Sequence, residues 1–177
     1  MVSQQEVPES IPATLTRAGA AGFWLAVLLT GAGQLILHRL SSGNGIDITE
    51  AISKTAGRLP PLRTLGSAVL SVLLVGMGTS MGREGAPKQA GAVIANSLSD
   101  KAGLNDEQRR LLVACGAGAG MAAAYGVPLG GALFALEVLR GVLALRLILP
   151  ALLASAVATA VAWIALPDAP TYLIPAY

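Results

Sequence analysis

The stretch GMGTSMGREGAPKQAGAVIANS, residues 76–97, follows a long apolar run and places Arg83, Glu84 and Lys88 among glycines and small residues. One interpretation is a surface loop that only turns the chain. The other is a glycine-rich loop inside a lipid bilayer, where bare backbone amides would bind a negatively charged group. The composition of the rest of the chain favours the second interpretation.

That composition indicates the solvent in which the chain folds. Of its 177 residues, 54% are hydrophobic and only 12% are charged, whereas a soluble domain usually carries about 25% charged residues. A helix that crosses a bilayer needs about 20 apolar residues. We therefore predict an integral protein of the cell (inner) membrane that contacts lipid and crosses the bilayer several times. The apolar segments that suit this are residues 18–37, 64–82, 111–136 and 147–166.

Charge and reactive side chains exclude several functional classes. The net charge of +2 is too small to suggest a nucleic-acid partner. A single cysteine, Cys115, excludes an internal disulfide and a cysteine-cluster metal site, and His38 has no second histidine. We therefore expect neither a metal nor a cofactor. No nucleophile is paired with a base in a recognisable pattern, so we predict that the protein is not an enzyme.

The apolar pattern predicts an all-α fold in three parts. A polar tail covers residues 1–12, a transmembrane region residues 13–166 and an interfacial segment residues 167–177. The last apolar segment is expected to break near Pro150, because proline lacks a helical hydrogen-bond donor. The other helices are expected over residues 13–40, 47–56, 62–79 and 87–99, and over 111–136 with a break at Gly126-Val127-Pro128.

Local signals mark where these helices begin. Asp47 and Glu50 have the spacing of a capping box, with Asp47 at the N-cap. Pro87 suits a first helical turn, where its missing N–H has no helical partner in any case. Asn105 or Asp106 is expected to cap the helix that follows the polar loop. Alanine and glycine are dense after residue 111, which lets helix backbones approach closely in lipid.

Three of the predicted breaks share one design, a glycine-rich turn that opens onto a helix N-terminus. They are the segments 43–46, 82–86 and 126–128. A helix N-terminus leaves up to about four N–H groups unpaired and carries about half a positive charge. It therefore binds anions without a fully charged side chain in lipid. Broken helices within a membrane are tolerated where they line a cavity, so the pattern indicates an anion pathway.

The same segments resemble one known family. GREGAPKQAG is similar to the Gly-Arg-Glu-Gly-Pro signature of the CLC family of chloride channels and proton-coupled chloride transporters. GNGI resembles that family's Gly-Ser-Gly-Ile-Pro loop, and GAGAGMAAAYGVPLGGALFALEVLR resembles the pair of small-residue helices that follows. The order and spacing of the three match over residues 41–140. The resemblance implies broken, re-entrant helices that form part of a CLC-type inverted-repeat fold.

The resemblance also implies passive transport of chloride or a similar small anion, as in a voltage-gated chloride channel. It implies that Glu84 is the gate, a carboxylate that occupies an anion position when ionised and moves or protonates to let anions pass. The alternative is a structural ion pair of Glu84 with Arg83 or Lys88. The positions that correspond to the family's anion-binding loops are Gly43, Asn44, Gly45, Ile46, Gly82, Arg83, Gly85 and Ala86.

The sequence departs from the family pattern at several of these positions. Asn44 stands where the family has an anion-coordinating serine, and Asp47 replaces the following proline. As an N-cap, Asp47 would satisfy amides that an anion would otherwise use. Lys88 is unusual in a first helical turn, where the helix dipole disfavours cations. It either attracts anions at the pore mouth or is only a solvated charge.

A further departure concerns proton coupling. Val138 takes the place of the inner glutamate that transfers protons in the family's exchangers, so that position on the proton pathway is lost. Glu137, at the first position of the family's Glu-Glu pair, is expected to pair with Arg140 three residues later. These residues favour a channel over a proton-coupled exchanger, which stays an alternative.

The chain is short for this resemblance. It corresponds to most of the first half of the family's membrane domain and lacks the second half, with its Gly-x-Phe-x-Pro loop and anion-binding tyrosine. We therefore expect a fragment whose partner is either a complementary second-half polypeptide or a second copy, in a homodimer like the family's. A third interpretation is a non-transporting membrane remnant whose small-residue helices serve only packing.

Overall fold

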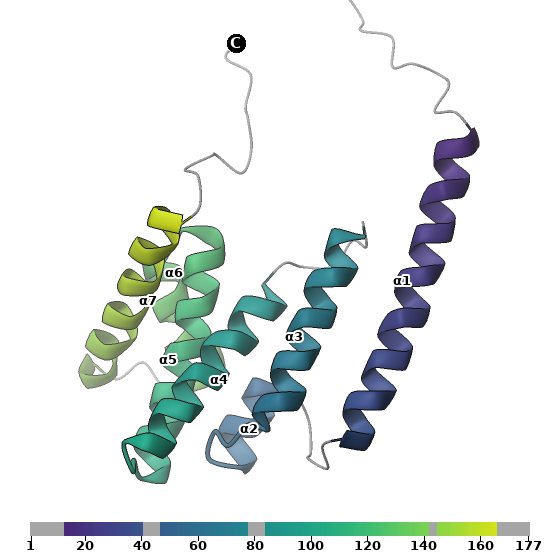
Figure 1. Ribbon diagram of the computed structural model, residues 1–177. Coiled ribbons are helices and arrows are strands. Elements are labelled where there is room, and N and C mark those ends of the chain that lie inside the picture. Colours follow the sequence, from purple (N-terminus) through teal and green to yellow (C-terminus); the bar gives the residue numbers. More distant parts are fainter. Residues whose placement is uncertain (1–12, 41–46, 78–83, 142–144, 166–177) are drawn as a thin grey trace, which may run out of the picture.

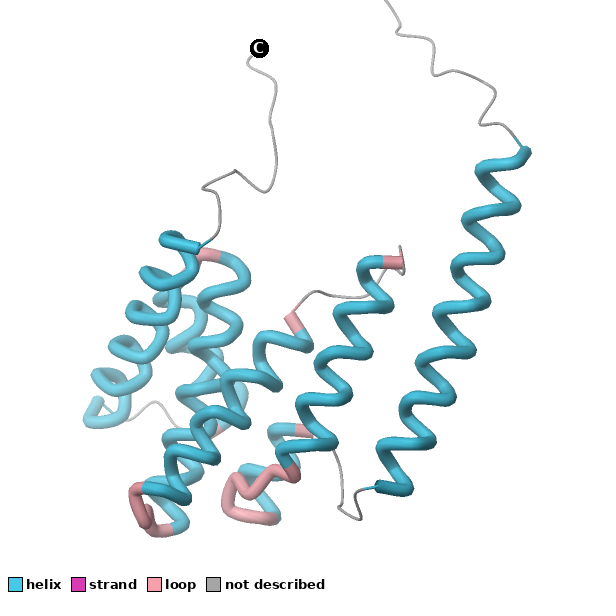
Figure 2. Tube along the Cα trace, viewed as in Figure 1, coloured by secondary structure: helices cyan, strands magenta, loops and turns pink. Residues whose placement is uncertain are grey.

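The computed structural model describes residues 13–40, 47–77, 84–141 and 145–165, and within these ranges all regular structure is helical (Figures 1 and 2). This confirms the all-α prediction. The predicted tail over residues 1–12 and the interfacial segment over residues 167–177 lie outside the described residues. The helices are α1 (Ala13–Leu40), α2 (Ile48–Lys54), α3 (Pro61–Gly76), α4 (Gly85–Lys101), α5 (Asp106–Tyr125), α6 (Pro128–Leu133), the π-helical η1 (Phe134–Leu139) and α7 (Leu145–Ala165).

Most helix ends follow the predicted signals. Helix α1 has the predicted bounds, and α5 begins after Asn105, whose side chain accepts a hydrogen bond from the backbone N–H of Gln108. The break after α5 is confirmed at Gly126, which adopts a left-handed conformation with φ of 69°. Glycine reaches this region without the steric cost that a Cβ brings. Local sequence chemistry therefore determines where these helices end.

The predicted break near Pro150 is wrong, because α7 runs through this residue without interruption. Pro150 is the sixth residue of the helix, so it removes a single intrahelical hydrogen bond close to the helix start. Packing of α7 against both α5 and α6 holds the helix together across this defect. Tertiary contacts override the local signal at this position.

Glycines set the closeness of the central helices. A methyl group at Gly116 of α5 would collide with the carbonyl oxygen of Gly91 on α4, and one at Gly120 would collide with the carbonyl oxygen of Pro87. A methyl at Gly118 would meet the carbonyl oxygen of Gly131 on α6 in the same way. These contacts confirm the prediction that small residues bring helix backbones together. They also fix the start of α4 against α5.

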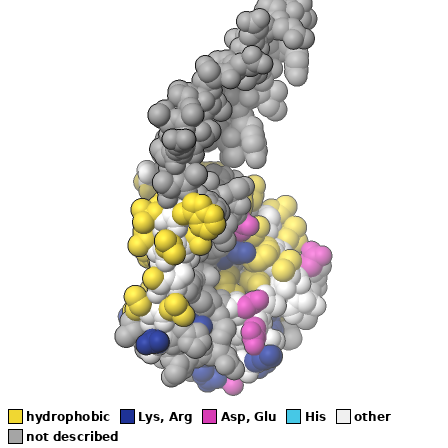
Figure 3. Space-filling view, turned by 90° about the vertical axis from the view of Figure 1, so that its right-hand side faces the viewer, with side chains coloured by type: hydrophobic (Ala, Val, Ile, Leu, Met, Phe, Trp, Pro, Cys, Tyr) yellow, Lys and Arg dark blue, Asp and Glu magenta, His cyan; other side chains and the backbone are white. Residues whose placement is uncertain are grey.

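The helices are arranged around this glycine-packed centre (Figure 1). Helices α6 and α7 pack against α5, α3 packs against α4, and α1 lies outermost against α3. The outer helices present large apolar side chains to the surroundings; Ile164 on α7 is 88% exposed. In Figure 3, hydrophobic side chains cover the upper part of the visible face and charged ones gather toward its lower end. Such a surface suits lipid contact.

Among the described residues, one helix is long and apolar enough to cross a bilayer on its own, Leu147–Ala165. Shorter apolar helices are found at Trp24–Gly33, Pro61–Gly76 and Pro128–Leu139. Of the several full-length spans that the sequence predicted, one has the required length among the described residues. Shorter helices are what a fold with broken, re-entrant segments contains.

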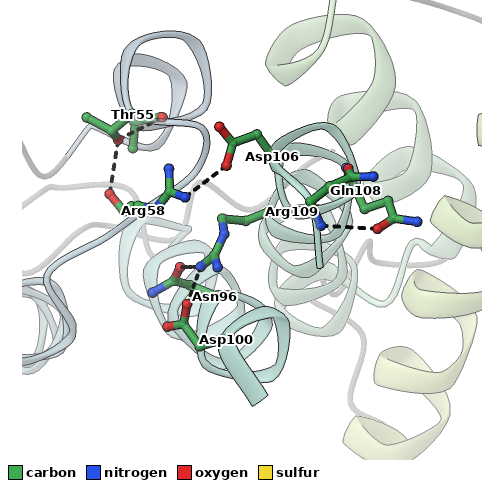
Figure 4. A network of polar contacts seen from close by, with 9 residues as sticks. Thr55, Arg58, Asn96, Asp100, Asp106, Gln108 and Arg109 are labelled. Atoms are coloured by element: carbon green, nitrogen blue, oxygen red, sulfur yellow. Dashed lines mark hydrogen bonds and ion pairs between the residues drawn. The ribbon is translucent and has the colours of Figure 1, made fainter. Parts of the chain in front are cut away.

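A buried polar cluster joins the α2–α3 connection to α4 and α5 (Figure 4). Arg109 of α5 has a side chain that is only 7% exposed, and its Nη1 donates to Asn96 Oδ1 at 2.9 Å and to Asp100 Oδ1 at 2.5 Å. Asn96 Nδ2 in turn donates to the carbonyl oxygen of Leu59 at 3.3 Å. Through this cluster, the segment that follows α2 is held against α4.

Candidate functional site

The first element of the site is the start of α2. Asp47 occupies the N-cap, where its Oδ1 accepts hydrogen bonds from the backbone N–H groups of Thr49 at 2.7 Å and Glu50 at 3.4 Å. The predicted cap is confirmed, but Glu50 does not complete a capping box: its carboxylate accepts from Lys54 Nζ at 3.0 Å. The chain's own carboxylate therefore uses amides that begin α2.

The second element is the start of α4, where Glu84 stands at the N-cap position. Its backbone is helical, with φ of −76° and ψ of −21°, and its side chain does not cap the helix. Its Oε2 instead accepts a hydrogen bond from the phenol Oη of Tyr125 at 3.0 Å. Tyr125 is the last residue of α5 and lies 41 positions later in the chain. The carboxylate thus contacts a residue of a neighbouring helix.

Lys88, four residues after Glu84, does not form the structural ion pair that was the alternative interpretation of Glu84. The Lys88 Nζ lies over the ring of Phe134, 5.4 Å from its centroid. An ammonium at this distance from an aromatic face is attracted to it by a cation–π interaction. The other candidate partner, Arg83, lies outside the described residues.

A cavity of about 230 Å³ lies where these elements meet. Its polar groups are the Asp47 carboxylate, the Thr49 hydroxyl, the Lys88 ammonium and the Gln89 amide. Gln89 Oε1 is buried and has no hydrogen-bond partner among the described residues, so the unused hydrogen-bonding capacity of this amide is that of an acceptor. The described lining residues are Asp47, Ile48, Thr49, Gly85, Lys88, Gln89, Phe134 and Leu139.

Two helices that follow predicted glycine-rich turns begin at this cavity, although the first of these turns, residues 43–46, lies outside the described residues. The start of α2 reaches it through Asp47, and the start of α4 reaches it through Gly85. Pro128, which ends the third turn and begins α6, is not among the described lining residues. The cavity is lined instead by Phe134 and Leu139 of η1, which continues from α6.

The predicted anion-binding residues are therefore described only in part. Gly85 lines the cavity, and Ala86 follows it in the first turn of α4 without being among the lining residues. The remaining positions of this prediction lie outside the described residues; they are Gly43, Asn44, Gly45, Ile46, Gly82 and Arg83.

The proton-pathway position lies on the π-helical turn η1. Val138 is 57% exposed and offers no titratable group. The predicted pair of Glu137 with Arg140 is wrong, because the Arg140 guanidinium forms its ion pair with Glu107 at the start of α5. A partner 33 positions away replaces the one expected three residues away. The π-helical turn, which the sequence did not indicate, changes the angular spacing on which an i,i+3 pair depends.

Sequence reasoning assigned no role to Tyr125 and Phe134, which contact Glu84 and Lys88 at the start of α4. Both belong to the small-residue segment, where Tyr125 directly precedes the predicted break at Gly126. The available signal was that aromatic residues occur in a segment otherwise rich in alanine and glycine. Their contacts join residues far apart in sequence, which no local pattern reveals.

The arrangement suits binding of a small anion rather than bond-making chemistry. The Lys88 ammonium and the backbone at the start of α4 supply positive potential beside the cavity, and the carboxylates of Asp47 and Glu84 lie at the two helix starts. Within the described ranges, no group of three or more histidine, cysteine, aspartate or glutamate residues could hold a metal ion.

Comparisons with known proteins show which sequences this chain resembles. The sequence model of a family described as "Voltage gated chloride channel" matches residues 22–176. The "Voltage-gated ClC-type chloride channel ClcB" of Yersinia pestis is 39% identical over 136 residues, which cover 77% of this chain and 32% of the relative. The protein of the same name from Citrobacter koseri is 38% identical over 112 residues, 63% of this chain and 26% of the relative. The chain thus spans between about a quarter and a third of these relatives' length. No solved structure matches the chain significantly.

Proposed function

The chain belongs to the voltage-gated chloride channel, or CLC, family, and we propose that it forms part of a passive pathway for chloride or a similar small anion across the cell (inner) membrane. The observation that carries this proposal is the cavity between the starts of α2 and α4. There the Lys88 ammonium and the backbone at the start of α4 offer positive potential to an anion. The large exposed apolar side chains of α1, α3 and α7 support a location in lipid.

In this pathway Glu84 is the gate. Its carboxylate carries the charge of a small anion and is attached at the edge of the cavity, directly before the lining residue Gly85. When ionised, it competes with an anion for the same positive potential. When protonated or held away from the cavity, it leaves that potential to the anion. A charged residue at membrane depth is usually functional, which supports this role over a structural one.

The pathway is completed by a second polypeptide segment. The relatives that carry the channel name are about three times as long as the region they share with this chain, and the polar cavity lies open at one side of the described helices. We propose that a complementary second-half polypeptide covers it, with a homodimer as the larger assembly. Chloride and lipid are then the small partners, and neither nucleic acid nor a cofactor takes part.

Val138 favours a channel over a proton-coupled exchanger. Valine cannot accept or release a proton, so a carboxylate relay through this position is absent. An exchanger would need a different internal route for protons. Anion passage without stoichiometric proton movement is therefore the expected behaviour.

Reconstitution tests this function. Three liposome samples are compared: the purified chain alone, a polypeptide that corresponds to the unmatched remainder of the Yersinia pestis relative alone, and both together. Chloride efflux and internal pH are recorded for each. We expect chloride flux without coupled proton movement when both polypeptides are present, and none from the remainder alone. Flux that drives stoichiometric proton movement would identify an exchanger. No flux under either condition would refute transport and identify a non-transporting membrane protein.

A further inference from the structure

The hydrogen bond between Tyr125 and Glu84 connects the proposed gate to the end of α5, a helix that does not belong to the predicted anion-binding loops. We propose that Tyr125 is a positioning residue for the gate: its phenol holds the ionised Glu84 carboxylate outside the cavity and so favours anion passage. This inference rests on the proposed function and adds a residue to it. Tyr125 Oη donates to Glu84 Oε2 at 3.0 Å, and Glu84 is not among the residues that line the cavity.

Glu84 has two alternative sets of partners. One is the Tyr125 phenol at the end of α5, which it contacts in the structure. The other is the first turn of its own helix, where no side chain caps the backbone and where Lys88 lines the cavity four residues later. Residues four apart lie on the same face of a helix. A rotation about the Glu84 side chain therefore moves the carboxylate between a position beside Tyr125 and one beside Lys88.

Tyr125 is the fixed partner in this pair. The α5 helix that carries it is packed against α4 without space for a methyl group at Gly116 or Gly120. The contact at Gly120 is with the Pro87 carbonyl oxygen, which lies three residues beyond Glu84. The backbones that carry the phenol and the carboxylate are therefore held at a constant separation. The flexible element is the Glu84 side chain, which leaves the phenol only by changing its rotamer.

The strength of this contact depends on the charge of Glu84. A hydrogen bond to an ionised carboxylate is about twice as strong as one between neutral groups. A protonated Glu84 carries no charge with which to compete for the anion position. The phenol therefore affects anion passage while Glu84 is ionised and has little effect once the carboxylate is protonated.

The variant Tyr125→Phe removes the phenol oxygen and keeps the ring, so it tests the proposal with little change in packing. We expect chloride flux at neutral pH to fall about tenfold, the size of a lost hydrogen bond to a charged group. At acidic pH, where Glu84 is protonated, flux through the variant and the unmodified protein should converge. In a Glu84→Gln background, Tyr125→Phe should have no effect at either pH.

The matched control is Trp163→Phe. Trp163 on α7 lies beside Gly126, directly after Tyr125, so this variant alters an aromatic side chain at the same turn without touching Glu84. It should leave flux and its pH dependence unchanged. Equal flux from Tyr125→Phe and the unmodified protein at neutral pH would overturn the proposal. So would an equal loss in the Glu84→Gln background, which would identify a purely structural role, and so would a rise in flux.

An infrared measurement separates this inference from the proposed function. The carboxylate stretching bands of Glu84 are isolated at neutral pH by subtracting the spectrum of Glu84→Gln from that of the purified chain. Tyr125→Phe should shift these bands, and Trp163→Phe should not. If the protein transports no anion, the proposed function fails, while a shifted band still supports the contact. Unshifted bands in Tyr125→Phe would refute the hydrogen bond whatever the transport result.

Discussion

Asp47 and Glu84 are two carboxylates at equivalent places, each directly before a helix that begins at the same cavity. Asp47 has an extended backbone, with φ of −72° and ψ of 117°, and its short side chain folds back onto the amides of α2. Glu84 has a helical backbone and a longer side chain that reaches α5 instead. An N-cap side chain reaches its own helix from a non-helical backbone. The same charge therefore caps its own helix at one helix start and contacts a different helix at the other.

The largest effect on stability is expected from Gly120→Ala, which would displace the start of α4 from α5. The added methyl would collide with the Pro87 carbonyl oxygen, a backbone atom that cannot rotate away. Overpacking of a well-packed interior costs about 3 kcal/mol. We expect most of the protein to lose its monodisperse state on mild heating in detergent, as followed by size-exclusion chromatography.

The matched control for this change is Gly76→Ala at the end of α3. Apart from its chain neighbours and the backbone of its own helix, no heavy atom of the described residues lies within 4 Å of the added methyl at this position. Its elution profile after heating should match that of the unmodified protein. If Gly120→Ala were equally tolerated, the start of α4 would not be fixed against α5. The contrast between Glu84 at the start of α4 and Asp47 at the start of α2 would then lose its basis.

Arg109→Ala should have the next largest effect, because it removes the cluster that holds the segment after α2 against α4. The change leaves the buried Asn96 Oδ1 without its donor, at a cost of about 2 kcal/mol. The Asp100 carboxylate is 60% exposed and is rehydrated at little cost. Thermal unfolding in detergent measures the loss.

Arg58→Ala provides the comparison for Arg109. Arg58 Nη2 forms an exposed ion pair with Asp106 at 2.9 Å, and such pairs contribute no more than about 1 kcal/mol. A similar loss of stability in both variants would mean that burial does not distinguish the two arginines. Then the cluster in Figure 4 would not be what aligns the two helix starts.

Asp47→Ala should have the smallest of these effects on stability. It removes an N-cap side chain that accepts from two backbone N–H groups, which costs about 1 kcal/mol. Asp47→Asn keeps a capping oxygen and should be nearly neutral in the same unfolding experiment. Equal destabilisation by Asn and Ala would mean that the charge of Asp47, and not its hydrogen bonds, stabilises α2. Asp47 could then no longer be described as a cap that acts through its hydrogen bonds.

The helices and their caps were readable from the sequence because their causes are local. Asp47, Asn105 and the left-handed Gly126 act within a few residues of their own positions. The dense glycines of α5 likewise indicated close helix packing before any contact was known. The hypothesis that Glu84 is the gate came from the resemblance of its glycine-rich loop to the family's signature, because spacing alone would not have suggested it.

The features that sequence reasoning missed join residues far apart in the chain. Tyr125 meets Glu84 across 41 positions, and Arg140 meets Glu107 across 33. Pro150 was expected to break a helix that packing against α5 and α6 keeps continuous. Each outcome is set by which helix faces which, and a local pattern contains no such information. Sequence therefore predicted the elements of the site better than the contacts between their side chains.

The most direct test of the account compares chloride flux through Glu84→Ala and Asp47→Asn in liposomes that also hold the complementary polypeptide, between acidic and neutral pH. If Glu84 is the movable gate, Glu84→Ala should conduct chloride at a high rate that no longer depends on pH. Asp47→Asn should keep the pH dependence of the unmodified protein. An unchanged flux and pH profile in Glu84→Ala would contradict the central claim that this carboxylate competes with the anion.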